Sequence, residues 1–369
     1  MGEGESPLEN VGIKPAFWKG KRVLITGHTG FKGAWLSLWL QDLGALPVGY
    51  ALDPPTKPNL FETADVARGM VSIKGDVRDL EAVRRAIDQH QPEIVIHMAA
   101  QSLVCQSYEQ PVETIATNVL GTVNVLEALR GQQAVRVIIN VTSDKCYDNK
   151  ERPEGYREEE PLGGHDPYSS SKACAEIVTA AYRKSFFSGS GDHRSAAVAT
   201  VRAGNVIGGG DWAKDRLVPD IISSLNSRLS PFIRNPTAVR PWQHVLDPLH
   251  GYLMLAERMW DDGAAFSGAW NFGPDHSDDK PVSWVADKLC LRWGEGAKWQ
   301  QDGKTHPHEA HRLCLDTTKA RNVLEWKPGV SLDHALDWIV EWYQTYQQGN
   351  GMKDLTLSQI HRFQKLTNS

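Results

Sequence analysis

The feature that most constrains the fold of this chain is a regular alternation of short apolar runs and amphipathic segments along its N-terminal half. A β-branched run at residues 22–26 is followed by a glycine-punctuated turn at residues 27–33 and by apolar residues at helical spacing over residues 34–43. Strand character returns at residues 47–52. This order predicts a βαβ unit, in which a helix crosses between two parallel strands.

The same rhythm continues as far as residue 201. We expect further strands at residues 71–76, 94–98, 135–142 and 197–201, and helices at residues 80–90, 111–130 and 168–187. Apolar strands that alternate with amphipathic helices are buried on both faces, so the sequence predicts an α/β fold with a doubly wound parallel sheet.

The alternation ends near residue 204, and turn-rich stretches such as residues 208–212 then separate the helical patterns. We therefore expect a smaller mixed α/β domain in the C-terminal part of the chain. The predicted division is a polar N-terminal tail (1–16), a sheet domain (17–204) to which a segment near 243–265 returns, and a mostly substrate-binding remainder (205–369).

Composition excludes several classes of protein. The 40 Lys and Arg against 45 Asp and Glu give a formal charge of −5, which argues against nucleic acid as a partner. The N-terminus is too polar for a signal peptide and no apolar run is long enough to cross a membrane, so we expect a cytoplasmic protein with no membrane partner. The five cysteines stand apart, and no cysteine or acid completes a zinc set with His306, His308 and His311, so no metal site is predicted.

Gly27, Gly30 and Gly33 lie between a predicted strand and a predicted helix. Glycine permits a tight turn and lets backbone amides approach a pyrophosphate at the helix N-terminus. Asp53 follows the second strand, where a carboxylate accepts a hydrogen bond from a ribose 2′-hydroxyl. The combination predicts a dinucleotide site that favours NAD over NADP, with Lys57 as the nearest cation in the sequence. The alternative is that Asp53 is a turn residue.

Three further titratable residues are candidates for the same site. Asp76 ends the third strand at the same sheet edge and is a candidate acceptor for the adenine amino group. Tyr168 and Lys172 lie four residues apart at the start of a predicted helix, so their side chains share one face. A lysine in that position stabilises tyrosinate, which takes a proton from an alcohol or sugar hydroxyl during its oxidation.

At this point the chain resembles a known family, the extended short-chain dehydrogenase/reductases, from about residue 17 to about residue 346. The matching motifs are Thr26-Gly-x-x-Gly-Phe-x-Gly33, Gly75-Asp-Val77, His97-Met-Ala-Ala-Gln101, Asn118-Val-Leu-Gly-Thr122, Thr142-Ser-Asp144, Tyr168-x-x-x-Lys172 and Arg240-x-Trp-x-x-Val-x-Asp247.

The resemblance implies a set of ligand contacts. Those to NAD are Gly27, Thr29, Gly30, Phe31, Lys32, Gly33, Asp53, Asp76, Val77, Ala99, Ala100, Gln101, Asn118, Thr142, Tyr168 and Lys172. Those expected toward a sugar nucleotide are Ser102, Asn205, Arg216, Leu217, Arg234, Arg240 and Glu309. Among them Arg240 matches the family motif, whereas Arg216 and Arg234 are chosen from their placement, since an arginine fork pairs with phosphate oxygens.

Residues 143–147, 202–212 and 240–245 carry a narrower resemblance, to the nucleotide-sugar 4,6-dehydratases and among them the branch that acts on CDP-glucose. Such an enzyme needs an acid for the departing C6 hydroxyl and a base for the C5 proton, besides the groups that oxidise C4. Asp144 maps onto the acid, and Ser143 is expected to bond the C4 oxygen. Lys145 stands where better-known hexose dehydratases have Glu, and a lysine serves as a base only when its amine is neutral.

Three alternatives remain open: a nucleotide-sugar 4-epimerase or reductase, a dehydratase of dTDP- or GDP-hexose, and a non-catalytic scaffold that senses NAD. An epimerase has no use for an acid at C6, and a scaffold needs none of Asn118, Asp144, Tyr168 and Lys172. No residue identifies the nucleotide base, so CDP follows from the resemblance alone. The resemblance also implies a homodimer that pairs helices 111–130 and 168–187 in a four-helix bundle, and a role in making deoxysugars for cell-surface polysaccharide such as O antigen.

Overall fold

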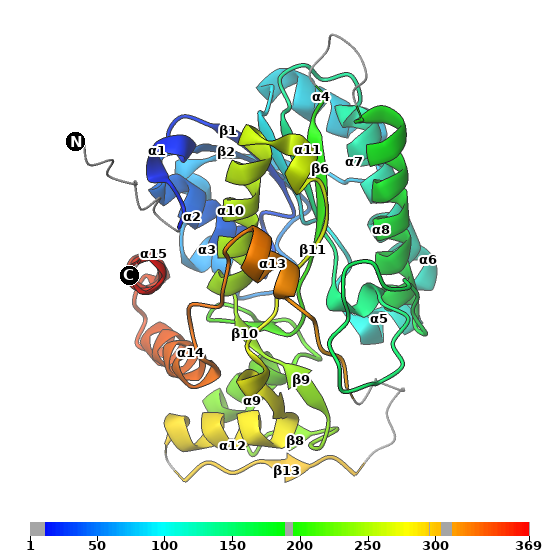
Figure 1. The fold of residues 1–369 in the computed structure, drawn as a ribbon. Coiled ribbons are helices and arrows are strands. Elements are labelled where there is room, and N and C mark those ends of the chain that lie inside the picture. The colour runs from blue at the N-terminus through cyan, green and yellow to red at the C-terminus, as the bar shows by residue number, and fades with distance from the viewer. Residues whose placement is uncertain (1–11, 189–194, 295, 304–311, 369) are drawn as a thin grey trace, which may run out of the picture.

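The computed structural model describes residues 12–188, 195–294, 296–303 and 312–368. At its centre lies a seven-stranded sheet in the order β11-β6-β5-β4-β1-β2-β3, with every neighbouring pair parallel (Figure 1). The strands are β1 (Arg22–Thr26), β2 (Leu46–Ala51), β3 (Val71–Lys74), β4 (Ile94–His97), β5 (Val137–Val141), β6 (Ala197–Arg202) and β11 (Gly268–Asn271). This confirms the predicted doubly wound sheet, whose strand order reverses next to β1.

Helices cover both faces of the sheet, and each face has its own apolar core. One core joins the sheet to α4, α7 and α8, and the other joins it to α2 and α10. The helices of this part are α1 (Pro15–Trp18), α2 (Phe31–Asp42), α3 (Leu60–Thr63), α4 (Leu80–His90), α5 (Val104–Glu109), α6 (Pro111–Ile115), α7 (Gly121–Leu129), α8 (Pro167–Phe186), α10 (Leu246–Asp261) and α11 (Gly263–Phe266), with 3₁₀ turns η1 (Val66–Gly69) and η3 (Asp144–Cys146) and a π-helical turn η2 (Ala116–Leu120).

The rest of the chain forms short paired strands and helices below the sheet in Figure 1. Three two-stranded ladders pair β7 (Val206–Ile207) with β10 (Gln243–His244), β9 (Val239–Pro241) with β12 (Asp279–Pro281), and β8 (Phe232–Ile233) with β13 (Gln300–Gln301). Around them lie α9 (Leu217–Asn226), α12 (Val282–Trp293), α14 (Leu332–Gln347) and the 3₁₀ turn η4 (His276–Asp278), while α13 (Thr318–Val323) contacts β11 and α15 (Met352–Thr367) contacts α2.

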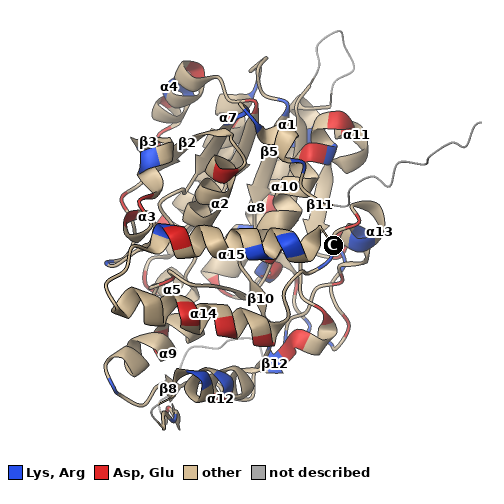
Figure 2. Ribbon diagram, turned by 90° about the vertical axis from the view of Figure 1, so that its left-hand side faces the viewer, with Lys and Arg blue, Asp and Glu red and all other residues tan. Residues whose placement is uncertain are grey.

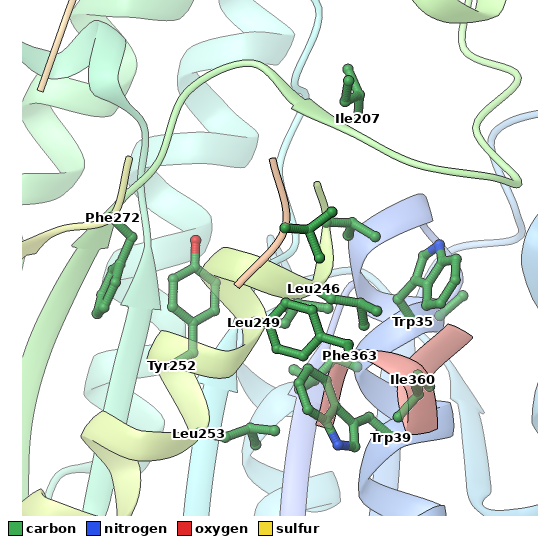
Figure 3. Close-up of a cluster of buried hydrophobic side chains, with 14 of the residues drawn as sticks. Trp35, Trp39, Ile207, Leu246, Leu249, Tyr252, Leu253, Phe272, Ile360 and Phe363 are labelled. Atoms are coloured by element: carbon green, nitrogen blue, oxygen red, sulfur yellow. The ribbon is translucent and has the colours of Figure 1, made fainter. Parts of the chain in front are cut away.

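Besides α10, two late segments return to the part of the chain that holds the sheet. Strand β11 adds a seventh strand beside β6, which the sequence did not predict because its four residues include a glycine and an asparagine. Helix α15 packs on α2 (Figure 2), and the ring of Phe363 meets that of Trp39 (Figure 3). The His361 imidazole lies 2.9 Å from the Asp42 carboxylate. The predicted division into domains stays a prediction.

The first described residues pack on the body of the protein. Residues 12–16 include the start of α1, and Ile13 is buried in the core. The physical reason is a docking site on α10: the Glu257 carboxylate accepts hydrogen bonds from the Lys14 amide at 2.9 Å and from the Trp18 indole at 2.7 Å. Residues 1–11 lie outside the described part of the chain.

Ion pairs join two helices of the lower part. Arg292 of α12 donates to Asp333 and Asp337 of α14, and Lys288 lies 3.8 Å from Asp333. Figure 2 shows basic residues on α12 and acidic residues on the neighbouring α14. Within the described residues, no helix combines the length and the apolar character that a membrane crossing requires.

Candidate active site

The glycine turn after β1 is shaped by close backbone contacts. Gly27 has a positive φ of 77°, and a Cβ on it would lie 2.8 Å from the Ala99 nitrogen. A Cβ on Gly33 would lie 2.2 Å from the Gly27 carbonyl oxygen. Gly30, the N-cap of α2, has space around it, since its Cβ would meet only that same oxygen at 3.4 Å. The turn thus leaves room for a phosphate at the first amides of α2, which fits a dinucleotide.

The candidate ribose acceptor already has a partner. The Asp53 carboxylate accepts a hydrogen bond of 2.5 Å from the ammonium of Lys74 on β3, and both side chains are exposed. The cation nearest to Asp53 is therefore Lys74. The sequence indicates Lys57 instead, because only the pairing of β2 with β3 brings Lys74 to Asp53. The Thr29 hydroxyl donates to the Leu52 carbonyl at 2.9 Å and ties the glycine turn to the end of β2.

The acid after β3 is fixed by its neighbours. The Asp76 carboxylate accepts hydrogen bonds from the backbone and guanidinium of Arg78, which hold its pKa below the ordinary value. The side chain of Val77 is buried, and a Cβ on Gly121 would lie 2.7 Å from it. Because β3 runs parallel to β2 and β1, Asp76 and Val77 follow it at the same sheet edge as the glycine turn.

Asn118 holds the loop after β4. Its Oδ1 accepts from the Gln101 amide and its Nδ2 donates to the Gln101 carbonyl, both at 2.9 Å, and Nδ2 also donates to the Ser171 hydroxyl of α8 at 2.8 Å. Asn118 lies in the π-helical turn, which interrupts the helix predicted at 111–130. Turns of this kind are frequent at functional sites. The clamp fixes the loop of Ala99, Ala100 and Gln101 beside α8.

Three groups lie together at the end of β5. The Ser143 hydroxyl donates to Asp144 Oδ1 at 2.9 Å and lies beside the phenol of Tyr168. Asp144 is 2% exposed, and its Oδ2 has no hydrogen-bond partner among the described residues. The backbone of Gly204 lies against this oxygen, since a Cβ there would come within 1.9 Å of it. Lys145 follows, half-buried, with its amide bonded to Ser143 Oγ.

Tyr168 and Lys172 lie on one buried face of α8, as predicted from their spacing. The Asp166 carboxylate caps the helix by accepting from the Ser169 amide at 2.9 Å, and Pro167 occupies its first turn. Burial raises the pKa of Tyr168 to about 12, an effect that the neighbouring Ser143 hydroxyl and the charge of Arg216 oppose. Burial lowers the pKa of Lys172 to about 8, and its Nζ donates to the Val141 carbonyl at 3.2 Å.

Lys32 of α2 is a second amine at this site. Its Nζ donates to the Tyr252 hydroxyl of α10 at 3.0 Å. Burial, followed by the nearby charges of Lys172 and Arg216, lowers its pKa to about 7, and Asp144 opposes that shift. The Phe31 ring beside it is half-buried and lies close to Gly208. Lys32 therefore belongs to the same electrostatic cluster as Asp144 and Lys172.

Two arginines connect the lower part of the chain to the loop that follows β4. Arg216 donates to the Asp211 carboxylate at 2.8 Å and to the Ser102 hydroxyl at 2.7 Å. Arg234 Nη1 lies 3.5 Å from the Cys105 sulfur. The structure thus brings Ser102, Arg216 and Arg234 to one edge of the site, and Leu217 follows as the first residue of α9.

The remaining predicted substrate residues are placed differently. Asn205 has a left-handed backbone with φ of 43°, and its carbonyl accepts from the Gln243 amide. Arg240 is 9% exposed in β9 and its Nη1 donates to the Val239 carbonyl at 3.1 Å. Glu309 lies outside the described residues, as do His306, His308 and His311.

Sequence reasoning missed three residues that shape the site. Asp166 was detectable, since an Asp-Pro pair before an amphipathic run is a helix-start signal. Glu176 lies four residues after Lys172 on the same face of α8, and that spacing is also visible in the sequence. Tyr252 carries no local signal, because only the return of α10 to the sheet brings it to Lys32.

The parallel sheet, the glycine turn, and a tyrosine and lysine beside the end of β5 define a dinucleotide-binding fold of the short-chain dehydrogenase/reductase class. The chain belongs to the GDP-mannose 4,6 dehydratase family, whose model matches residues 24–338. It is 52% identical over 356 residues to a CDP-glucose 4,6-dehydratase of Salmonella typhimurium, covering 96% of this chain and 99% of that protein.

More distant relatives have the same fold. A dTDP-glucose 4,6-dehydratase of Xanthomonas campestris pv. campestris is 26% identical, over 88% of this chain and 95% of that protein. A dTDP-glucose 4,6-dehydratase structure from Streptomyces venezuelae, with NAD bound, has a TM-score of 0.74 and 23% identity, over 89% of this chain and 98% of that one. A UDP-glucose 4-epimerase structure from Thermotoga maritima has a TM-score of 0.76 and 20% identity, over 88% and 99%.

Proposed function

We propose that this protein is an NAD-dependent lyase that converts CDP-glucose to CDP-4-dehydro-6-deoxyglucose. The observation that carries the proposal is the buried carboxyl of Asp144, which accepts a hydrogen bond from Ser143 beside the phenol of Tyr168. A 4-epimerase needs the tyrosine and serine but has no step for the acid. The 52% identity to a CDP-glucose 4,6-dehydratase supports the choice of substrate.

NAD fits the glycine turn, which has room at Gly30 and close packing at Gly27 and Gly33. When bound, NAD supplies the hydride acceptor for oxidation at C4 and the hydride donor for reduction at C6. The Asp53 carboxylate would accept from a ribose hydroxyl and would repel a 2′-phosphate. Gln101 and Asn118 would contribute to the same site, since their mutual hydrogen bonds fix the loop after β4.

In the proposed reaction, each proton transfer is carried out by a different side chain near Asp144 or by Asp144 itself. Tyr168 takes the O4 proton while Ser143 holds the C4 oxygen. Lys145 then removes the C5 proton, which is acidic beside a C4 ketone, and Asp144 protonates the C6 hydroxyl as it leaves as water. Asp144 Oδ2 suits that role because it is buried and has no hydrogen-bond partner among the described residues.

For the sugar nucleotide, Arg216 and Arg234 would pair with the diphosphate, since both lie at the loop of Ser102. Arg240, Asn205, Leu217 and Glu309 complete the proposed set. The product would be a precursor of deoxysugars in cell-surface polysaccharide, made in the cytoplasm.

The substrate assignment is tested by turnover of CDP-, dTDP-, UDP- and GDP-glucose under identical conditions. A 4-keto-6-deoxy sugar absorbs in the near ultraviolet after alkali treatment, which provides the readout. We expect the CDP sugar to have the highest kcat/KM. Preference for another nucleotide would correct the substrate, and no product from any of the four would refute the dehydratase assignment.

The residue roles are tested by separating exchange from elimination. Asp144→Asn removes the acid, so water loss is expected to slow by about 10²–10⁴-fold, while C5 still exchanges its proton for solvent deuterium. Lys145→Ala is expected to abolish that exchange. Asp148→Asn is the control, since its carboxylate pairs with Lys150 at the surface. Normal turnover by Asp144→Asn, or normal exchange by Lys145→Ala, would contradict the corresponding role.

We also propose that two copies pair through α6, the π-helical turn and α8. Four large apolar residues on this surface are exposed: Val112 (81%), Ile115 (39%), Leu120 (55%) and Ile177 (56%). Apolar residues that gather on one face of neighbouring helices are typical of an interface between subunits.

A further inference from the structure

Glu176 continues the face of α8 that carries Tyr168 and Lys172. The three residues follow at intervals of four, and Glu176 is 3% exposed. Its Oε1 accepts a hydrogen bond from the Thr142 hydroxyl, and its Oε2 accepts from the Thr200 hydroxyl and from Arg202 Nη2, both at 2.7 Å. A buried carboxylate with three donors is held in one position.

Two side chains on successive turns of α8 therefore hold the end of β5. Lys172 Nζ donates to the Val141 carbonyl, and Glu176 accepts from the hydroxyl of the next residue, Thr142. Ser143 and Asp144 follow directly in the chain. The position of the proposed acid thus depends on how α8 holds the strand that precedes it.

Glu176 also acts on the charge of Lys172. Burial lowers the pKa of Lys172, and the charge of Glu176 is the largest effect that opposes it. Besides Tyr168 and Asp144, which the proposed reaction uses, the titratable groups near Lys172 are Cys146 of η3, His97 of β4 and Lys32 of α2.

None of those three groups provides a stable charge near neutral pH. Burial raises the pKa of the Cys146 thiol, and burial lowers the pKa of His97 to about 3, so both are neutral. Lys32 is a cation when it is charged, and burial lowers its pKa to about 7. Among these neighbours Glu176 is the anion, and its own cation is Arg202, equally buried at 3%.

We propose that Glu176 is a positioning residue for proton transfer, which holds Thr142 at the end of β5 and keeps Lys172 in its ammonium form. Arg202 balances the carboxylate and so sets how much of its charge reaches Lys172. This inference rests on the proposed function, since it assumes that Tyr168 and Lys172 move the O4 proton.

The test measures the Lys172 titration directly, by NMR of ¹³Cε-labelled lysine in resting protein, with the signal assigned by its loss in Lys172→Met. Glu176→Gln removes the anion but keeps its shape, and is expected to lower the Lys172 pKa by about one or more. Arg202→Met leaves the carboxylate without its cation and is expected to raise it. Thr200→Val, which removes one hydroxyl without a change of charge, should leave it in place.

A conservative variant separates charge from shape. Glu176→Asp keeps the charge and is expected to retain a Lys172 pKa near the wild-type value, whereas a purely structural role predicts that isosteric Gln is the milder change. If Arg202→Met does not fold, the comparison of Glu176→Gln with Glu176→Asp still tests the proposal. A shift in the same direction for Glu176→Gln and Arg202→Met, or no shift in Glu176→Gln, would overturn the proposal.

Activity gives an independent second readout. In Glu176→Gln the alkaline limb of kcat should move to lower pH, since the ammonium is lost earlier. Because the NMR titration needs no turnover, absence of dehydratase activity in the wild type would refute the proposed function and leave the result on Lys172 standing.

Discussion

At the scale of single residues, burial of amines is the main electrostatic feature of the site. Lys32 has a pKa lowered to about 7 by burial and by the charges of Lys172 and Arg216. In the unfolded chain the same amine keeps its proton up to its ordinary pKa of 10.5. Between these two values the unfolded state binds more protons, so the free energy of unfolding should rise with pH.

Lys32→Met should remove that rise, which is at most about 1.4 kcal/mol per pH unit for one proton. The measurement is the free energy of unfolding of cofactor-free protein between pH 7 and 10. Lys150→Met is the control, since its exposed ammonium pairs with Asp148 at the surface. An unchanged slope in Lys32→Met would show that the amine titrates as it does in the unfolded chain.

At the scale of elements, the alternation of apolar runs was enough to predict the parallel sheet. It could not predict β11, whose four residues have no strand pattern, or the π-helical turn inside the helix predicted at 111–130. The spacing of apolar residues does not reveal which backbone groups pair by hydrogen bonds. The tyrosine, the lysine and the glycines were predictable because local spacing fixes their geometry, whereas the contacts of Asp53 with Lys74 and of Lys32 with Tyr252 depend on chain pairing.

At the scale of the whole molecule, the exposed apolar surface on α6, the π-helical turn and α8 predicts a dimer in solution. Ile177→Asp places a charge on that surface and should yield a monomer in sedimentation experiments, because burying an unpaired carboxylate is costly. Leu291→Asp is the matched control, since Leu291 is 75% exposed on α12, away from this surface. A dimer that survives Ile177→Asp, or a monomeric wild type, would contradict the proposed interface.

We propose that this site removes water from a CDP-linked glucose and regenerates its cofactor. The most direct measurement is the mass and proton spectrum of the product formed from CDP-glucose in D₂O with the wild-type protein and catalytic NAD. We predict a 4-keto-6-deoxy sugar that has lost one water and carries one solvent deuterium at C5. A sugar that keeps its C6 hydroxyl, as a C4 epimer would, or a product without deuterium at C5, would contradict the account.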